Sequence, residues 1–405
     1  MELREWLSQS SHHCAVALDI SDAYGSCAFS LIDNLLSAAC DTPTANLIKQ
    51  FNNVTLHHGE SSFRMRRGLQ QGLPHSPILF NLLLDKILPP GVKTSIRAYA
   101  DDILVLGMNV GELETTCAVI KTALEQAGLM INTHKCFSIG TSSSVLFGEN
   151  EVQQLTLENQ HRYLGMVVLN GAPLRTSCSE KLHQLNDEME RILSLPLTPF
   201  QLILAVNSHI IPSFTFHGRL EWIRRKDLAF ADIQIAKTVK KTFRLPMRGT
   251  PNSFLHTQQR DGGLGIKSLL VDTDCNRISL LLSALTLSFF TTAFNTFLSQ
   301  CEHEWTEVNG VDQLKLEYTT RGDIKRRERR TDGRSRLANT NWLLPLQALR
   351  RLNLTLCRES PSSFSILGDG WRATAHTINY RMRHVKRLAA VAEWAALTST
   401  GRAVP

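Results

Sequence analysis

The chain has 405 residues, 43% of them hydrophobic, and its 44 lysines and arginines outnumber 37 aspartates and glutamates to leave a net charge of +7. A chain of this length can bury a sizeable core and is expected to fold as two or three subdomains, with a polyanion as a suitable partner. None of its nine cysteines forms a C-x-x-C pair, so no zinc-knuckle pattern is present and a reducing compartment is favoured. The sequence opens with charged residues and no apolar run follows, so no secretory signal is expected.

The first predicted element is a short buried strand. Residues 15–18 are uniformly apolar, and a strand over them would present Asp19 at its C-terminal end. Asp19 is equally compatible with the N-cap of a helix. A helix is expected over residues 30–39, where Leu31, Leu35 and Leu36 share one face.

A loop rich in glycine and proline comes next and leads into a second helix. Glycines in residues 66–75 would let the backbone approach a ligand closely. Ser76 is expected to be the N-cap, with Pro77 at the first helical position and an apolar helix running through Ile78, Leu82 and Leu83 to Leu88. A loop that opens into a helix N-terminus can cradle a phosphate or a base, although alone this pattern is weak.

A hairpin tipped with two carboxylates is the most informative element. Two strand-like runs, residues 96–98 and 103–106, are joined through Tyr99, Ala100, Asp101 and Asp102. Adjacent like charges are unfavourable unless a cation binds them, and hard oxygen ligands suit Mg²⁺ or Mn²⁺. An ordinary acidic turn is the alternative, but a strand ending in Asp19 beside such a hairpin favours a metal site.

Five segments then form a longer pattern in a defined order. They read DISDAYGS at 19–26, GLQQGLPHSPILFN at 68–81, YADD at 99–102, GLMINTHKC at 128–136 and YLG at 163–165. The pattern resembles the reverse transcriptase of non-LTR retrotransposons, in the form found with a restriction-like endonuclease. Further likeness at residues 195–216, 243–246 and 260–266 extends the resemblance to about residue 300.

The resemblance implies a role for each matching residue. Asp19, Asp101 and Asp102 would bind two Mg²⁺ or Mn²⁺ ions, which activate the primer 3′-hydroxyl and stabilise the pyrophosphate leaving group. Tyr24 would lie under the sugar of the incoming nucleotide and exclude a 2′-hydroxyl, unless it is simply a core aromatic; Lys135 would meet the triphosphate or be a solvated loop residue. The expected nucleotide-binding residues are Ile20, Asp22, Ala23, Tyr24, Gln71, Gly72 and Lys135, and the expected primer grip is Tyr163, Leu164 and Gly165.

The implied fold class is α+β. Residues 1–170 would form a right-hand polymerase palm, with a ferredoxin-like antiparallel sheet and helices, and residues 1–18 would be the remnant of the fingers. Residues 171–300 would form an α-helical thumb, and residues 301–405 a basic linker and helical region. Compared with relatives, the fingers are expected to be largely absent and the nuclease end to be missing, so the chain resembles the middle of a longer polyprotein. This chain alone is therefore expected to extend primers feebly or not at all.

Three segments in the C-terminal half carry no catalytic motif. Residues 278–300 have no charge, but scattered serines and threonines favour a buried helix over a membrane span, and no membrane partner is expected. One basic cluster lies in residues 321–336 and a second consists of Arg381, Arg383, Lys386 and Arg387. Both clusters would add phosphate contacts, with a solvated or disordered linker as the alternative for the first. Residues 342–354 and 389–397 have helical patterns.

The leading function is therefore RNA-templated DNA synthesis. The expected partners are an RNA template, a DNA primer or target and dNTPs, and the expected location is the nucleus, alone or with the cytoplasm. A catalytically inactive fragment that retains nucleic-acid binding is the alternative. A viral RNA polymerase and an intron maturase fit less well, because Tyr24, Tyr99 and the likeness at residues 195–266 point to retrotransposons.

Overall fold

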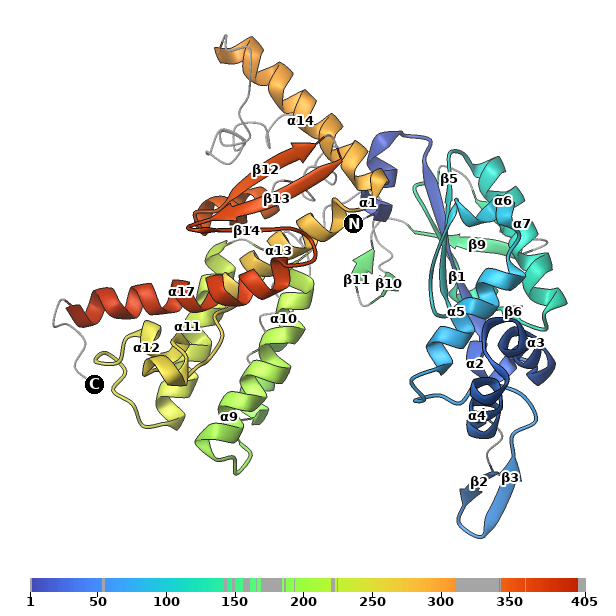
Figure 1. Ribbon diagram of the computed structural model, residues 1–405, viewed down its shortest axis with the longest axis horizontal. Coiled ribbons are helices and arrows are strands. Elements are labelled where there is room, and N and C mark those ends of the chain that lie inside the picture. Colours follow the sequence, from blue (N-terminus) through green and yellow to red (C-terminus); the bar gives the residue numbers. More distant parts are fainter. Residues whose placement is uncertain are drawn as a thin grey trace. The chain divides into compact units, whose positions relative to one another are not determined.

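The computed structural model describes residues 2–52, 55–141, 144–147, 150–155, 161–164, 166–168, 184–185, 187–192, 194–219, 223, 225–309, 342, 344–360 and 362–399. The chain divides into two compact units, one formed by Trp6–Gly171 and the other by Met1–Glu5 with Ala172–Pro405. Figure 1 shows the sheet of the first unit and the mainly helical second unit.

The first unit is built on one mixed sheet, with strand order β4-β5-β1-β7-β9-β8 and β6 paired to β1. These strands are β1 (Cys14–Ser21), β4 (Ile96–Tyr99), β5 (Asp102–Gly107), β6 (Met130–Ile131), β7 (Phe137–Ile139), β8 (Val145–Phe147) and β9 (Asn150–Gln154). Neighbours pair antiparallel except β7 and β9, which are parallel. The expectation of a wholly antiparallel sheet is therefore wrong, because β9 runs in the same direction as β7.

Helices and two hairpins complete this unit. The helices are α1 (Glu2–Gln9, of which the residues from Trp6 onward belong to this unit), α2 (Ala23–Ser26), α3 (Phe29–Ala39), α4 (Thr42–Asn52), α5 (Ser76–Ile87), α6 (Pro90–Lys93), α7 (Val110–Gln126) and the 3₁₀ turn η1 (Thr133–Lys135). The hairpins are β2 (Thr55–His58) with β3 (Ser61–Arg64), and β10 (His161–Tyr163) with β11 (Met166–Val168). Apolar side chains of β1, α3, α5 and α7 share one core, and α7 packs on β1 and β5.

The local predictions for β1 and α5 have different outcomes. Residues 14–18 are all buried, so the predicted strand is confirmed, and Asp19 lies in it rather than at a helix N-cap. In α5 the N-cap is His75, while the Ser76 hydroxyl donates to the Gln70 carbonyl at 2.6 Å. The predicted cap is therefore wrong, whereas the predicted helix is present. Of its predicted apolar residues Leu83 and Leu88 are buried and Ile78 and Leu82 are exposed, because the buried face is formed by Leu79, Phe80, Leu83 and Leu84.

The second unit is mainly helical and also contains a small sheet. Its helices are α9 (Pro199–Ala205), the π-helical turn η2 (Val206–Ile210), α10 (Ile211–Gly218), α11 (Arg225–Thr242), α12 (Asn252–His256), η3 (Gln259–Asp261), α13 (Leu269–Ala284), α14 (Ser288–Asn309) and α17 (Ile378–Ser399). The antiparallel sheet has the order β12 (Thr355–Ser360), β13 (Ser363–Gly368), β14 (Trp371–Ala373). The sequence patterns indicated none of these three strands.

Two apolar cores stabilise the second unit. One joins residues of α9, α10 and α11 to the start of α13. The other joins the rest of α13 and α14 to β12–β14 and α17, so it runs across residue 300. A single helix over residues 278–300 was expected, but the chain breaks between α13 and α14, because Leu285, Thr286 and Leu287 form a turn.

The second unit also contains the apolar segment and the second basic cluster identified in the sequence. Among the described helices, none alone is long and apolar enough to cross a membrane. One pair of helices, Leu269–Ala284 with Ser288–Ser299, is together long and apolar enough, but the two are bent by 109° relative to each other. On α17, Lys386 pairs with Asp272 and Arg387 pairs with Asp261. Two cations of the second basic cluster are thus paired with carboxylates. The cluster at 321–336 lies outside the described residues.

Candidate active site

Strands β1 and β5 bring two acidic residues directly opposite each other. In the antiparallel register Asp19 pairs with Asp102, and Tyr99 pairs with Asp102 across the β4–β5 hairpin. The hairpin turn therefore consists of two residues, Ala100 and Asp101, and Ala100 adopts the left-handed φ of +54°. A positive φ at the first turn position matches the right-handed twist of the two strands, which is why the hairpin can be this tight.

The electrostatic environment of Asp102 follows from this pairing. Partial burial raises the pKa of the Asp102 carboxyl above its usual value, and the nearby charges of Asp101 and Asp19 raise it further. The positive charge of Lys135 lowers the pKa of Asp102 and so opposes these effects. The Nζ of Lys135 lies 3.5 Å from Oδ2 of Asp19. The site thus concentrates negative charge that one exposed lysine partly neutralises.

The donor chemistry of this site fits a hard divalent cation, since carboxylate oxygens are the ligands that Mg²⁺ and Mn²⁺ prefer. Asp19 and Asp102 lie opposite each other, and Asp101 lies in the turn beside them. Across the described parts of the chain, no group of three or more His, Cys, Asp or Glu side chains is gathered in a way that could hold a metal ion. The pair Asp19 and Asp102 is therefore the core of the candidate metal site.

Tyr24 lies on α2, close to the hairpin tip. Its ring stacks on Phe80 of α5, with ring centroids 5.0 Å apart and an interplanar angle of 22°. Burial raises the pKa of the Tyr24 hydroxyl, and the charge of Asp101 contributes to the same effect. Phe80 was not among the predicted site residues. The sequence signal that could have identified it as a support for the site is an aromatic residue in a helix that directly follows a glycine-rich loop.

The glycine-rich loop is fixed to α2 by backbone hydrogen bonds. The Gly68 amide donates to the Cys27 carbonyl at 2.7 Å and the Leu69 amide donates to the Tyr24 carbonyl at 2.8 Å. Gln71 and Gly72, further along the loop, are exposed. Segments that are more than 40 residues apart in sequence are thereby held next to each other, and the loop presents its tip to solvent.

The remaining predicted nucleotide-binding residues fall into two groups. Ile20 and Ala23 are only 2% and 4% exposed as whole residues, so both belong to the core. Asp22 has a left-handed φ of +41°, and its carboxylate lies against Gly25, where any Cβ would come within 2.3 Å of Oδ2. Lys135 ends the turn η1 and is 65% exposed.

The predicted primer-grip residues lie in the β10–β11 hairpin, in which Tyr163 pairs with Met166. Tyr163 packs edge-on against Phe137 of β7, at 6.5 Å between ring centroids. Burial raises the pKa of the Tyr163 hydroxyl, and the charge of Asp102 raises it further, so this hydroxyl lies near the carboxylate pair. Leu164 occupies the turn with a φ of +48°, and Gly165 lies outside the described residues.

Comparison with known proteins agrees with this geometry. Residues 3–168 match the family described as reverse transcriptase (RNA-dependent DNA polymerase). The chain carries a reverse transcriptase domain. The match covers the whole carboxylate site, the glycine-rich loop and the β10–β11 hairpin, and so places them in one RNA-dependent DNA polymerase family domain.

Relatives of the reverse transcriptase domain come from R2 retrotransposable elements. The retrovirus-related Pol polyprotein of a type-1 R2 element from Popillia japonica is 29% identical over 64% of this chain and 40% of its own length. Similar polyproteins from Nasonia vitripennis and Drosophila melanogaster are each 28% identical over 50% of this chain, and over 22% and 21% of their own lengths. The chain thus spans between about a fifth and two fifths of these curated relatives.

Among solved structures, a telomerase from Candida albicans in complex with a fragment of telomeric RNA matches 60% of this chain and 46% of its own chain. The sequence identity is 12% and the TM-score is 0.26, and no argument below rests on this match.

Proposed function

We propose that this chain is the RNA-directed DNA polymerase part of a non-LTR retrotransposon. It would extend the 3′-hydroxyl of a DNA primer on an RNA template with dNTPs, by two-metal phosphoryl transfer. The observation that carries the proposal is the register of β1 and β5, which sets Asp19 opposite Asp102 beside a two-residue turn containing Asp101. In this reading the first unit contains the palm and the helices of the second unit contain the thumb.

Each side chain then has a defined task. Asp19, Asp102 and Asp101 would hold two divalent ions, which when bound would activate the primer 3′-hydroxyl and neutralise the leaving pyrophosphate. Lys135 would leave Asp19 and turn to the triphosphate, because its exposed ammonium is free to move away from a carboxylate that a metal ion neutralises. It would then donate a proton to the pyrophosphate.

Selection of the nucleotide and positioning of the primer would depend on the residues around Asp19 and Asp102. Tyr24, held by its stack on Phe80, would close the space beside the sugar and so exclude a 2′-hydroxyl. Gln71 and Gly72 on the exposed tip of the loop would lie against the new base pair, and the segment that contains Ile20, Asp22 and Ala23 would form the other side of the nucleotide site. Tyr163, Leu164 and Gly165 would position the primer end, and the proposed DNA target implies a nuclear location.

The test is primer extension on an RNA template with dNTPs and Mg²⁺, comparing the chain with its Asp101→Asn/Asp102→Asn variant. We expect at most feeble extension by the unchanged chain and none detectable in the variant, since removal of metal ligands abolishes the charge stabilisation of the transition state. Asp33→Asn/Asp85→Asn is the matched control, because it removes two carboxylates that pair with exposed lysines elsewhere in the first unit.

Equal extension by the chain and the Asp101→Asn/Asp102→Asn variant would contradict the proposal. If neither protein extends primers but both bind the primer–template, the alternative function, an inactive fragment that retains nucleic-acid binding, would be favoured instead.

A further inference from the structure

One lysine contacts the same aspartate that is proposed to bind a divalent ion. The Nζ atom of Lys135 lies 3.5 Å from Oδ2 of Asp19. The two side chains differ in their surroundings, because the Asp19 side chain is 23% exposed and the Lys135 side chain is 65% exposed. The carboxylate is therefore held in the sheet, while the ammonium reaches it from the solvent side.

The backbone that carries Lys135 is attached to the strand of Asp19. The Asn132 amide donates to the Asp19 carbonyl at 2.8 Å, and the Lys135 amide donates to the Asn132 carbonyl at 3.0 Å. The preceding strand β6 pairs with β1 through Ile131 and Ile20. These bonds fix the start of the lysine side chain beside Asp19, whereas its flexible four-carbon stem can still rotate. The ammonium can thus approach Asp19 or leave it without a change in the fold.

The charge of Lys135 acts on both carboxylates of the paired strands. It contacts Asp19, and it also opposes the rise in the pKa of Asp102 that burial and the neighbouring acids cause. Acidic side chains that face each other are stabilised by a positive charge between or beside them. Lys135 supplies one such charge from the chain itself.

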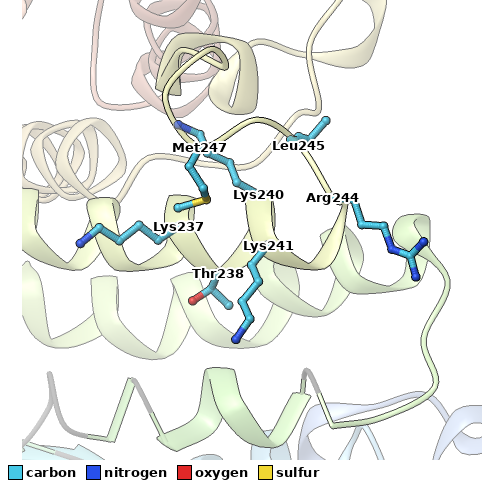
Figure 2. A pocket seen from close by; sticks show the side chains of 7 residues that line it. All are labelled: Lys237, Thr238, Lys240, Lys241, Arg244, Leu245 and Met247. Carbon is cyan, nitrogen blue, oxygen red and sulfur yellow. The ribbon is translucent and has the colours of Figure 1, made fainter.

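Other lysines show that an exposed ammonium does not bend onto the protein by default. Figure 2 shows the C-terminal end of α11, where the side chains of Lys237 and Lys241 extend away from the helix in different directions. Both residues are exposed, and no acidic residue lines the pocket beside them. Attraction by the acidic site is therefore the reason that Lys135 lies against Asp19.

A divalent ion bound by Asp19 must compete with this ammonium. Oxygen ligands bind Mg²⁺ at about 2.0–2.1 Å, so an ion on Oδ2 of Asp19 would lie within roughly 6 Å of an ammonium in contact with the same atom. Positive charges at this separation repel each other. Lys135 can relieve the repulsion by turning into solvent, and the loss of such an exposed contact changes an equilibrium constant by up to about fivefold. Competition should therefore weaken metal binding without blocking it.

The simpler explanation is an ion pair that only stabilises the folded chain and stays in place when the site is loaded. The geometry disfavours this explanation, because the ammonium contacts a carboxylate oxygen of Asp19 and so lies where a metal ion on that oxygen would be repelled. An ion pair that must open for the site to fill couples its own opening to metal binding.

We propose that Lys135 is a built-in competitor of the divalent ions, which the triphosphate of the incoming nucleotide draws away from Asp19. This role rests on the proposed function, in which Asp19 and Asp102 bind the ions. Without nucleotide the ammonium neutralises part of the site and weakens metal binding. With nucleotide the ammonium turns to the triphosphate and metal binding tightens. Because coupling between two ligands is reciprocal, metal ions must strengthen nucleotide binding by the same factor.

The first experiment measures binding of Mn²⁺ to the full chain without nucleotide, from the electron paramagnetic resonance signal of the free ion. We expect Lys135→Gln to bind Mn²⁺ roughly twofold to fivefold more tightly than the unchanged chain, since it loses the competing charge. Lys135→Arg keeps the charge and should bind Mn²⁺ as weakly as the unchanged chain. Lys93→Gln is the matched control, because Lys93 pairs with Asp85 at 2.7 Å elsewhere in the first unit.

The second experiment tests release of the lysine by the triphosphate. Binding of a fluorescent dNTP analogue is measured with and without Mn²⁺, for the unchanged chain and for Lys135→Gln. The factor by which Mn²⁺ tightens nucleotide binding should be roughly twofold to fivefold smaller in Lys135→Gln, because the variant has no ion pair to open. Mn²⁺ bound by the nucleotide in solution contributes equally to both proteins and cancels in the comparison.

Equal Mn²⁺ binding by Lys135→Gln and the unchanged chain would overturn the proposal, as would tighter binding by Lys135→Arg and Lys135→Gln alike. An equal effect of Mn²⁺ on nucleotide binding in the unchanged chain and Lys135→Gln would also overturn it. The Asp101→Asn/Asp102→Asn variant separates this result from the proposed function. If that variant loses Mn²⁺ binding while Lys135→Gln has no effect, the metal site stands and only the role of Lys135 is wrong. If it binds Mn²⁺ like the unchanged chain, the proposed metal site itself is wrong.

Discussion

Asp19 and Asp102 lie opposite each other on paired strands at one edge of the sheet, with Asp101 in the adjoining turn. Partial burial is the main cause of the raised pKa of Asp102, and the like charges of Asp101 and Asp19 add to it, so the ionised carboxylates destabilise the folded chain. Lys135 offsets part of the repulsion through its contact with Asp19. The arrangement is therefore stable enough to form but gains most when a cation binds.

We predict that Asp102→Asn raises the stability of the chain near neutral pH. The pKa of Asp102 is higher in the folded than in the unfolded chain, so the folded state binds more protons, and stability falls as pH rises from the ordinary Asp range through the folded pKa. Asparagine does not ionise and therefore removes this decrease in stability. Urea unfolding at several acidic pH values measures the pH dependence of the unfolding free energy. Asp85→Asn, which only breaks an exposed contact to Lys93, is the control.

Addition of Mg²⁺ should stabilise the unchanged chain and leave Asp102→Asn nearly unaffected, because binding to the folded state alone shifts the unfolding equilibrium. A fall in stability on introducing asparagine, or equal stabilisation of both proteins by Mg²⁺, would contradict the assignment of Asp102.

At the scale of elements, the contact between the glycine-rich loop and α2 connects two motifs that are far apart in sequence. Gly68 has a φ of +102°, and a Cβ on it would lie 3.0 Å from Gly25 Cα and 3.2 Å from the Tyr24 carbonyl oxygen. No side chain fits between these backbones without displacing one of them. The position of Tyr24 thus depends on a residue of the loop.

We predict that Gly68→Ala destabilises the chain by about 2–4 kcal/mol, from backbone strain together with overpacking. It should also weaken nucleotide use, measured as a higher KM for dNTP, because α2 and Tyr24 must shift. Gly72→Ala is the matched control for stability: its φ is +93°, but nothing lies within 4 Å of the added Cβ, so only about 1–2 kcal/mol is expected. Equal losses for the two variants in chemical unfolding would show that the contact with α2 is unimportant.

At the scale of the whole molecule, the second unit depends on a buried carboxylate shared by several arginines. Asp274 of α13 is 2% exposed and accepts hydrogen bonds from Arg225 of α11 and from Arg351, whose Nε lies 2.7 Å from Oδ2. Arg277 lies beside them, and burial lowers its pKa to about 10. One aspartate thus joins α11, α13 and the helical residues before β12.

We predict that Asp274→Asn costs about 3–5 kcal/mol of unfolding free energy, because it leaves the buried guanidinium of Arg277 and the partly buried one of Arg351 without this counter-charge. Glu359→Gln is the control in the same unit, since Glu359 pairs with Arg372 at the surface and its loss should cost about 1 kcal/mol or less. Denaturant unfolding of the two variants measures the difference, and similar losses would show that the Asp274 cluster contributes no more than a surface ion pair.

The sequence alone determined the features that depend on neighbouring residues. The buried strand at residues 15–18, the β4–β5 hairpin with its acidic tip and the resemblance of five motifs all follow from local patterns of apolar, acidic and glycine residues. The tertiary structure alone decided the features that depend on distant partners, among them the parallel pairing of β7 with β9, the β12–β14 sheet, the stack of Tyr24 on Phe80 and the Asp274 cluster. Local spacing does not specify these contacts, because their energy arises only when segments remote in the chain are packed together.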